Sequence, residues 1–168
     1  MLQLKVLEYP HKALKTVSTP VTIFDDSLRI TVKAMLDLMY EDRGCGLAAN
    51  QVGILKRIIV MDLSRDYTDP RCYINPEILT TEGEVIHEEG CLSLPGLYPK
   101  VKRAIKVTFR YQDEFGETHT IEQADGLLAH CIQHENDHLD GILSIDRLSP
   151  LKRALIIKKF EKNQKQAS

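Results

Sequence analysis

Apolar side chains recur every three or four positions between residues 28 and 39, which is the period of an α-helix with one buried face. Asp25, Asp26 and Ser27 precede this stretch, and short polar side chains of this kind cap the first turn of a helix. The pattern therefore predicts an amphipathic helix near the N-terminus, followed by a turn at Gly44 and Gly46. The apolar positions of the helix are Leu28, Val32, Met35, Leu36 and Met39.

The middle of the chain changes to short segments that are rich in β-branched residues or alternate between apolar and polar positions, as strands do. A turn at 113–116 joins the last two segments, which predicts a hairpin. The expected extended segments cover residues 57–63, 73–79, 84–93, 104–111 and 118–123.

Helical periodicity returns at residue 125 and ends at Gly141, a residue typical of helix C-termini. Ser149 and Pro150 then predict the start of a last helix, which continues to about Lys162. Residues 164–168 are expected to form a disordered tail. Mixed or antiparallel strands in the middle, around a central helix and between an N-terminal and a C-terminal helix, predict one α+β domain over residues 1–168.

Composition is that of a globular protein. The 168 residues are 43% hydrophobic and 27% charged, which excludes a disordered, collagen-like or coiled-coil chain. The formal charge of −2 does not indicate a DNA-binding protein. Neither a membrane-length apolar run nor a secretion signal is recognisable, so we expect a cytoplasmic protein without a membrane partner. We also expect a monomer. The four cysteines lack C-x-x-C spacing and are expected to be free thiols, core residues or metal ligands.

The strongest chemical pattern is His134-Glu135-Asn136-Asp137-His138, an H-E-x-x-H match within the helix predicted after residue 125. Histidines four residues apart lie on one face of a helix and can reach one ion, while the glutamate between them can take a proton from water. The alternative is two surface histidines on a charged helix. The helical context favours the metal site.

A catalytic site of this type needs a third protein ligand. The position of a third histidine in metzincins is occupied by Ser144, and Glu161 is the downstream carboxylate that a gluzincin would use. His130 lies ~12 Å from His138 along the helix axis, too far to share one ion, and is expected to be a pocket or core residue. Cys91, at the end of an extended segment and after a glycine, is the remaining candidate, and its alternative is a buried free thiol.

Three segments together resemble the signature motifs of the peptide deformylase family, in the same order and spacing. They are GCGLAANQ at 44–51, EGCLS at 89–93 and QHENDHL at 133–139. By itself the first segment could pass for a phosphate loop, but no Lys-Ser or Lys-Thr follows. The resemblance covers nearly the whole chain, including LKVLEYPHKAL near the start and DRLSPLKR at 146–153.

The resemblance implies hydrolysis of the formyl group from N-formylmethionyl nascent peptides, with attack by metal-bound hydroxide and release of formate. Glu135 would be the general base and then the acid, while Gln51 and the backbone N–H of Leu92 would stabilise the oxyanion. One divalent ion is expected per chain, natively Fe(II), and a site of this chemistry also accepts Zn, Ni or Co. Its implied ligands are Cys91, His134 and His138.

A substrate peptide would bind as an added strand against the backbone of Gly46 and Gly90. His130 departs from the family pattern, because many relatives have an aliphatic residue in the methionine pocket there. Cys131 also lies on the inward helix face among leucines, where core packing is the simpler role. The expected substrate-binding residues are Gly44, Cys45, Gly46, Gly90, Leu127, His130 and Cys131.

Parts of the sequence are compatible with two other functions. A zinc endopeptidase using His134, His138 and Glu161 would leave the motifs around Gln51 and Cys91 unexplained. An RNA-binding module is suggested by residues 150–168, which hold six Lys or Arg and one Glu. A solvated basic helix is the simpler reading, and it is compatible with a transient ribosome contact, because deformylases act on chains that leave the ribosome.

Overall fold

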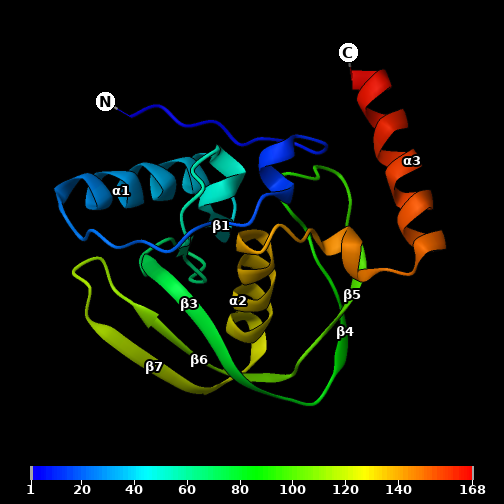
Figure 1. Ribbon diagram of the computed structural model, residues 1–168. Helices are drawn as coiled ribbons and strands as arrows, with labels where there is room; N and C mark the ends of the chain where they lie inside the picture. Colours follow the sequence, from blue (N-terminus) through cyan, green and yellow to red (C-terminus); the bar gives the residue numbers. More distant parts are fainter. Residues whose placement is uncertain (1, 168) are drawn as a thin grey trace.

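The computed structural model describes residues 2–167 and has an α+β architecture, as the sequence predicts (Figure 1). The helices are α1 (Asp26–Glu41), α2 (Gly126–Leu139) and α3 (Pro150–Ala167), with short 3-10 helices η1 (Lys12–Lys15), η2 (Ala49–Val52) and η3 (Ser144–Arg147). The strands are β1 (Gly46–Ala48), β2 (Ile58–Met61), β3 (Arg71–Glu82), β4 (Val85–Glu88), β5 (Lys100–Arg103), β6 (Lys106–Gln112) and β7 (Thr118–Ala124).

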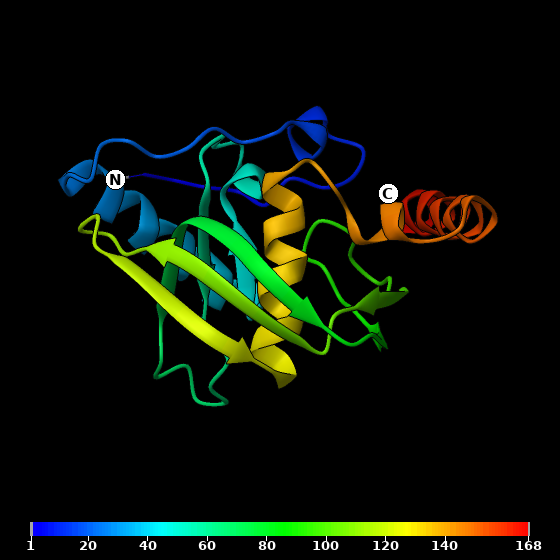
Figure 2. The same cartoon turned by 60° about the horizontal axis from the view of Figure 1, so that its bottom comes forward.

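The strands form two antiparallel sheets. The larger has the order β1-β2-β3-β6-β7, with Leu47 opposite Val60 and Ile78 opposite Phe109. The smaller pairs β4 with β5. In Figure 2 helix α2 lies across the strands β3, β6 and β7, so the sheet curves around the helix that carries the H-E-x-x-H pattern.

Strand β2 is buried on both faces, and its alternating side chains serve two different cores. Val60 packs into a cluster with the apolar face of α1, including Val32 and Met35. Ile59 points the other way and joins a cluster with Phe109 and Ile132 under α2. The sheet therefore separates two apolar layers, and α2 is held against a fully buried surface.

Helix boundaries follow the local signals in the sequence. The Asp25 carboxylate accepts a hydrogen bond from the Leu28 N–H at 3.0 Å and caps α1 as predicted. Helix α2 ends at Leu139, and Gly141 lies two residues beyond it with a φ of +74°. A Cβ at this position would lie 2.6 Å from the carbonyl oxygen of Lys15, so both the backbone conformation and the close approach require glycine.

The structure differs from the prediction in several elements. The segment expected at 84–93 is a strand only over β4, and a loop follows. The strands β1 and β5 and the 3-10 helices η1, η2 and η3 were not predicted. Strand β3 is longer than the predicted 73–79. The tail expected at 164–168 was wrong for residues 164–167, because α3 continues to Ala167; Ser168 lies outside the described residues.

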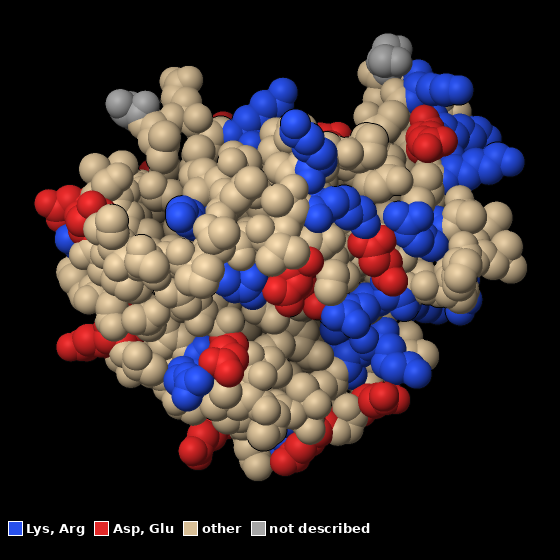
Figure 3. Space-filling model, in the orientation of Figure 1, with Lys and Arg blue, Asp and Glu red and all other residues tan. Residues whose placement is uncertain are grey.

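Helix α3 projects from the body of the molecule in both ribbon views (Figures 1 and 2). It is anchored through Phe160, whose ring meets that of Tyr9 edge-to-face at 5.9 Å. Lys and Arg side chains gather over α3 on the face shown in Figure 3. No helix within residues 2–167 is long and apolar enough to span a bilayer.

Candidate active site

The structure brings the three predicted metal ligands together. His134 and His138 lie one turn apart on α2, and Cys91 approaches them from the loop after β4. The His134 and His138 Nε2 atoms are 3.2 Å apart, and Cys91 Sγ is 3.4 Å from His138 Nε2. All three ligand atoms lie within 4.8 Å of one another, and both histidines are buried.

This donor set fits a divalent transition metal. One sulfur and two imidazole nitrogens suit Zn, Fe(II), Co or Ni. Burial holds the pKa of His138 well below its usual range, which favours the neutral imidazole that a metal requires. His134 directs its Nδ1 to Glu89 at 2.8 Å, so its Nε2 faces His138 and Cys91.

A buried ion-pair network fixes the orientation of His134. Arg103 donates to both Glu89 carboxylate oxygens at 2.6 and 2.8 Å, and to Asp137 at 2.6 Å. Asp137 also accepts from Arg147 at the surface. Burial alone would raise the pKa of Glu89, but the hydrogen bonds from Arg103 and His134 lower it to about 2. The Glu89 carboxylate therefore stays ionised and remains hydrogen-bonded to the His134 imidazole.

Glu135 lies beside the two histidines without contributing to the ligand group. Its side chain is buried, and Oε1 has no hydrogen-bond partner among the described residues. A Cβ at Gly46 would lie 2.7 Å from Glu135 Oε2, so only glycine leaves room for the carboxylate. Burial raises the pKa of Glu135 to about 7. A carboxylate in this state can exchange a proton at neutral pH.

Gln51 turns its amide towards the same group. Its Oε1 accepts from the Ala48 N–H at 2.9 Å, which fixes the side chain. Its Nε2 lies 3.1 Å from Ser93 Oγ and 3.7 Å from Cys91 Sγ. The Gln51 amide N–H groups therefore face the candidate metal site. Leu92 follows Cys91, and its side chain packs against Gly44.

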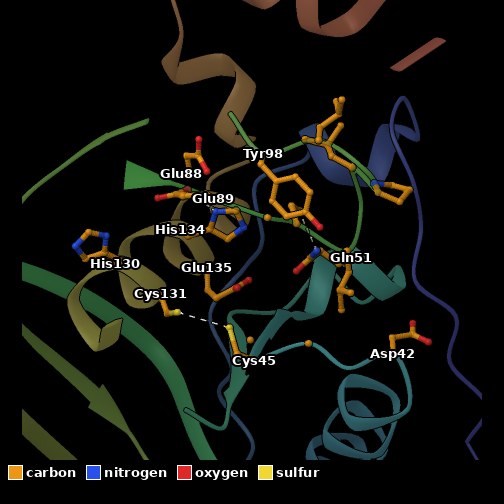
Figure 4. A pocket seen from close by; sticks show the side chains of 18 of the residues that line it. Asp42, Cys45, Gln51, Glu88, Glu89, Tyr98, His130, Cys131, His134 and Glu135 are labelled. Atoms are coloured by element: carbon orange, nitrogen blue, oxygen red, sulfur yellow. Dashed lines mark hydrogen bonds and ion pairs between the residues drawn. The ribbon is translucent and has the colours of Figure 1, made fainter. Parts of the chain in front are cut away.

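A cavity of about 510 Å³ opens onto these residues (Figure 4). Gln51, Leu92 and Glu135 line it, as do Cys91 and His134, while the fully buried His138 lies behind. Glu161, the alternative third ligand, is exposed on α3 and is not part of the cavity wall. The predicted substrate-binding residues that line the cavity are Gly44, Cys45, Gly46, Gly90, Leu127, His130 and Cys131.

His130 lines the cavity together with His87, which sequence reasoning missed. The two rings meet edge-to-face with centroids 4.0 Å apart. His130 Nδ1 is buried and has no hydrogen-bond partner among residues 2–167. Burial and the nearby His87 lower the pKa of His130 from its ordinary 6.5. Because β4 brings His87 to α2 only in the folded chain, no local sequence pattern could have paired them.

Cys131 combines the two roles considered for it. It packs against the apolar cluster under α2 and also lines the cavity, where its Sγ is 3.8 Å from Cys45 Sγ. The residues that the sequence did not indicate as part of the site include Glu89, Arg103 and Asp137. Asp137 occupies a variable position of the H-E-x-x-H pattern, so the pattern itself carries no signal for it.

Comparison with known proteins identifies the family to which the chain belongs. The family model of polypeptide deformylase matches residues 3–154. Peptide deformylase of Neisseria gonorrhoeae is 50% identical over 165 residues, covering 98% of both chains. That of Chromobacterium violaceum is 48% identical over 166 residues, covering 99% of each.

Solved structures give the same result. The crystal structure of a peptide deformylase from Legionella pneumophila superposes with a TM-score of 0.92 at 43% identity, covering 99% of this chain and 98% of that one. The enzyme from Synechococcus elongatus in complex with actinonin gives 0.88 at 42% identity, covering 93% and 86%. On sequence, fold and coverage, the chain belongs to the polypeptide deformylase family.

Proposed function

We propose that this chain hydrolyses the formyl group from N-formylmethionyl nascent peptides, with one divalent metal ion held by Cys91, His134 and His138. Membership of the deformylase family supports removal of an N-formyl group. The observation that carries the residue assignment is the convergence of one thiol and two imidazoles beside the buried Glu135. Fe(II) is the proposed native ion, and the same donors accept Zn, Ni or Co.

Each residue of the site has a separate role in the proposed reaction, set by its position. A bound divalent cation would act as a Lewis acid that lowers the pKa of water and polarises the formyl oxygen. Glu135 takes a proton from the attacking water and later gives it to the departing amine. Its pKa of about 7 and its unpartnered Oε1, with respect to the described residues, support this role. The Gln51 amide and the Leu92 backbone N–H donate to the developing oxyanion.

The substrate would lie in the cavity as an extended chain. Gly46 and Gly90 both line it and offer backbone groups, which supports pairing with a peptide strand. The first side chain would then enter the region lined by Leu127, His130 and Cys131. Action on nascent chains implies work in the cytoplasm, and the basic face of α3 in Figure 3 supports a transient electrostatic contact with the ribosome.

Metal content tests the ligand assignment together with the activity. We expect the parent to hold about one metal ion per chain and to release formate from a formyl-Met peptide. Cys91→Ala should lose both, because a site with two remaining protein ligands binds the ion too weakly. Cys72→Ala, a change at a cysteine outside the cavity, is the matched control and should keep both. Full occupancy in Cys91→Ala would refute the ligand set.

A second expected outcome concerns the pH dependence of substrate binding. The pKa of His130 is lowered, so the ring is neutral at pH 7 and gains its proton only as the pH falls below about 6.5. Burial, His87 and Arg103 disfavour a charged imidazole at His130 and together outweigh the opposite effect of the Glu89 carboxylate. An apolar substrate side chain beside the ring disfavours the charge as well, so KM for a formyl-Met peptide should rise in acid.

His130→Ile removes that titration and should flatten the acid limb of the KM profile. Comparing KM in the parent and the variant at each pH separates this effect from other groups that titrate in both proteins. Profiles that superimpose between about pH 5.5 and 8 would show that His130 does not contact the substrate side chain.

A further inference from the structure

Two thiols contact each other in the wall of the cavity. Cys45 lies in the segment that joins α1 to β1, and Cys131 lies on α2. Their sulfur atoms are 3.8 Å apart, which is van der Waals contact (Figure 4). Both residues line the cavity, and a small solute that enters it can reach them. The pair is separate from the ligand group of Cys91, His134 and His138.

The two thiols are not equivalent. Cys45 is exposed at the cavity, whereas Cys131 is half-buried against the cluster under α2. The hydrogen bond between the two thiols lowers the pKa of Cys45 to about 6 and raises the pKa of Cys131. Cys45 is thus the nucleophile and Cys131 the thiol positioned to resolve it. By contrast, burial raises the pKa of Cys72 to about 12.

We propose that Cys45 and Cys131 form a modification site, at which a hydroperoxide converts the two thiols reversibly into a disulfide. The Cys45 thiolate attacks a peroxide oxygen, giving a sulfenic acid and, after protonation, water when the oxidant is hydrogen peroxide. The Cys131 thiol then displaces the hydroxyl group, so that a sulfur–sulfur bond and a second water form. Two thiols lose two electrons, and the peroxide gains them. A dithiol reductant reverses the reaction.

Bond formation requires movement near the reacting groups. A disulfide is about 2.05 Å long, so the sulfurs must approach by about 1.8 Å from their present contact. Helix α2 is packed into the core, so the movement falls on the segment around Cys45. That segment has little space, because a Cβ at Gly44 would lie 2.8 Å from Leu92 Cδ1 and one at Gly46 would lie 2.7 Å from Glu135 Oε2.

A shift of Cys45 is therefore transmitted to its two glycine neighbours and from them to Leu92 and Glu135. It also places a covalent bridge in the wall of the cavity. Displacements of this size at a reacting site cost orders of magnitude in rate, so we expect oxidation to reduce deformylation at least about tenfold. This consequence rests on the proposed function, whereas formation of the bond does not.

The test uses nickel-loaded holoenzyme, so that oxidation of the metal ion does not contribute. After brief treatment with hydrogen peroxide, free thiols are alkylated and the protein is digested. Mass spectrometry should find one peptide pair that links residues 45 and 131. Formyl-Met peptide turnover, measured with nickel content on the same sample, should fall at least about tenfold at constant nickel and return with dithiothreitol.

Three variants sharpen the result, each compared with its own untreated rate. Cys45→Ser and Cys131→Ser should form no link and lose no activity that dithiothreitol restores. Cys72→Ala should behave like the parent. Absence of the 45–131 link, or a link to Cys91 instead, would overturn the site. A 45–131 link at unchanged turnover would overturn its effect on the reaction. If untreated holoenzyme failed to hydrolyse formyl peptides, the proposed function would be wrong. The peptide map would still show whether the disulfide between residues 45 and 131 forms.

Discussion

Glu135→Gln should lower turnover of a formyl-Met peptide by ~10²–10⁴-fold while leaving about one metal ion per chain. The amide keeps the shape of the carboxylate, so the close packing against Gly46 is preserved. It cannot accept a proton from water in the way that a carboxylate does. Because Glu135 is not part of the ligand group, metal content should not change.

Glu161→Gln is the matched control. Glu161 is exposed on α3, and it is the residue that an endopeptidase of the gluzincin type would use as its third ligand. We expect metal content and turnover of this variant to equal those of the parent. Loss of the metal ion in Glu161→Gln, or near-normal turnover in Glu135→Gln, would contradict the assignment of roles.

Arg103→Leu should reduce the free energy of unfolding by about 3–5 kcal/mol, because Glu89 stays buried without its cation and Asp137 keeps only its ion pair with Arg147. The side chains of Arg103, Glu89 and Asp137 are 3%, 5% and 9% exposed, so water cannot replace the lost guanidinium. Loss of the Arg103 hydrogen bonds also frees Glu89 from its orientation towards His134. Metal affinity should therefore fall by about 10–100-fold as well.

Arg110→Leu tests whether burial causes the effect. Arg110 pairs with Glu77 at 2.7 Å, a distance similar to those in the buried network, but the two side chains are 47% and 59% exposed. Exposed ion pairs contribute about 0–1 kcal/mol, so this variant should be nearly as stable as the parent in urea unfolding. Equal losses of stability in the two variants would show that the buried network contributes no more to the free energy of unfolding than the exposed ion pair does.

The parts of the site that the sequence predicts are those set by local geometry. Two histidines four residues apart in a helix must share a face, so the proximity of His134 and His138 follows from the pattern alone. Cys91 lies far away in sequence, and the local pattern left its role open between a ligand and a buried thiol. Its selection depended on the resemblance of three motifs, and the fold then accounts for the convergence, because the loop after β4 returns to α2.

The parts that could not be predicted depend on contacts between distant segments. Strand β5 consists of Lys100, Val101, Lys102 and Arg103, and its two inward residues are Val101 and Arg103. Because one of these inward residues is charged, the sequence pattern does not resemble that of a half-buried strand. Arg103 is tolerated inside only because Glu89 and Asp137 meet it there. Hydrophobic periodicity cannot anticipate a buried position that is satisfied by ion pairs.

The double burial of β2 makes the two halves of the molecule mechanically interdependent. Ile59 supports the helix that carries the two histidines, while the next residue, Val60, supports α1 on the opposite side. Detachment of α1 would expose one face of the strand to water and loosen the surface on which α2 rests. Helix α1 contributes no residue to the candidate ligand group. It is nevertheless part of the scaffold that holds the two imidazoles in their positions relative to each other.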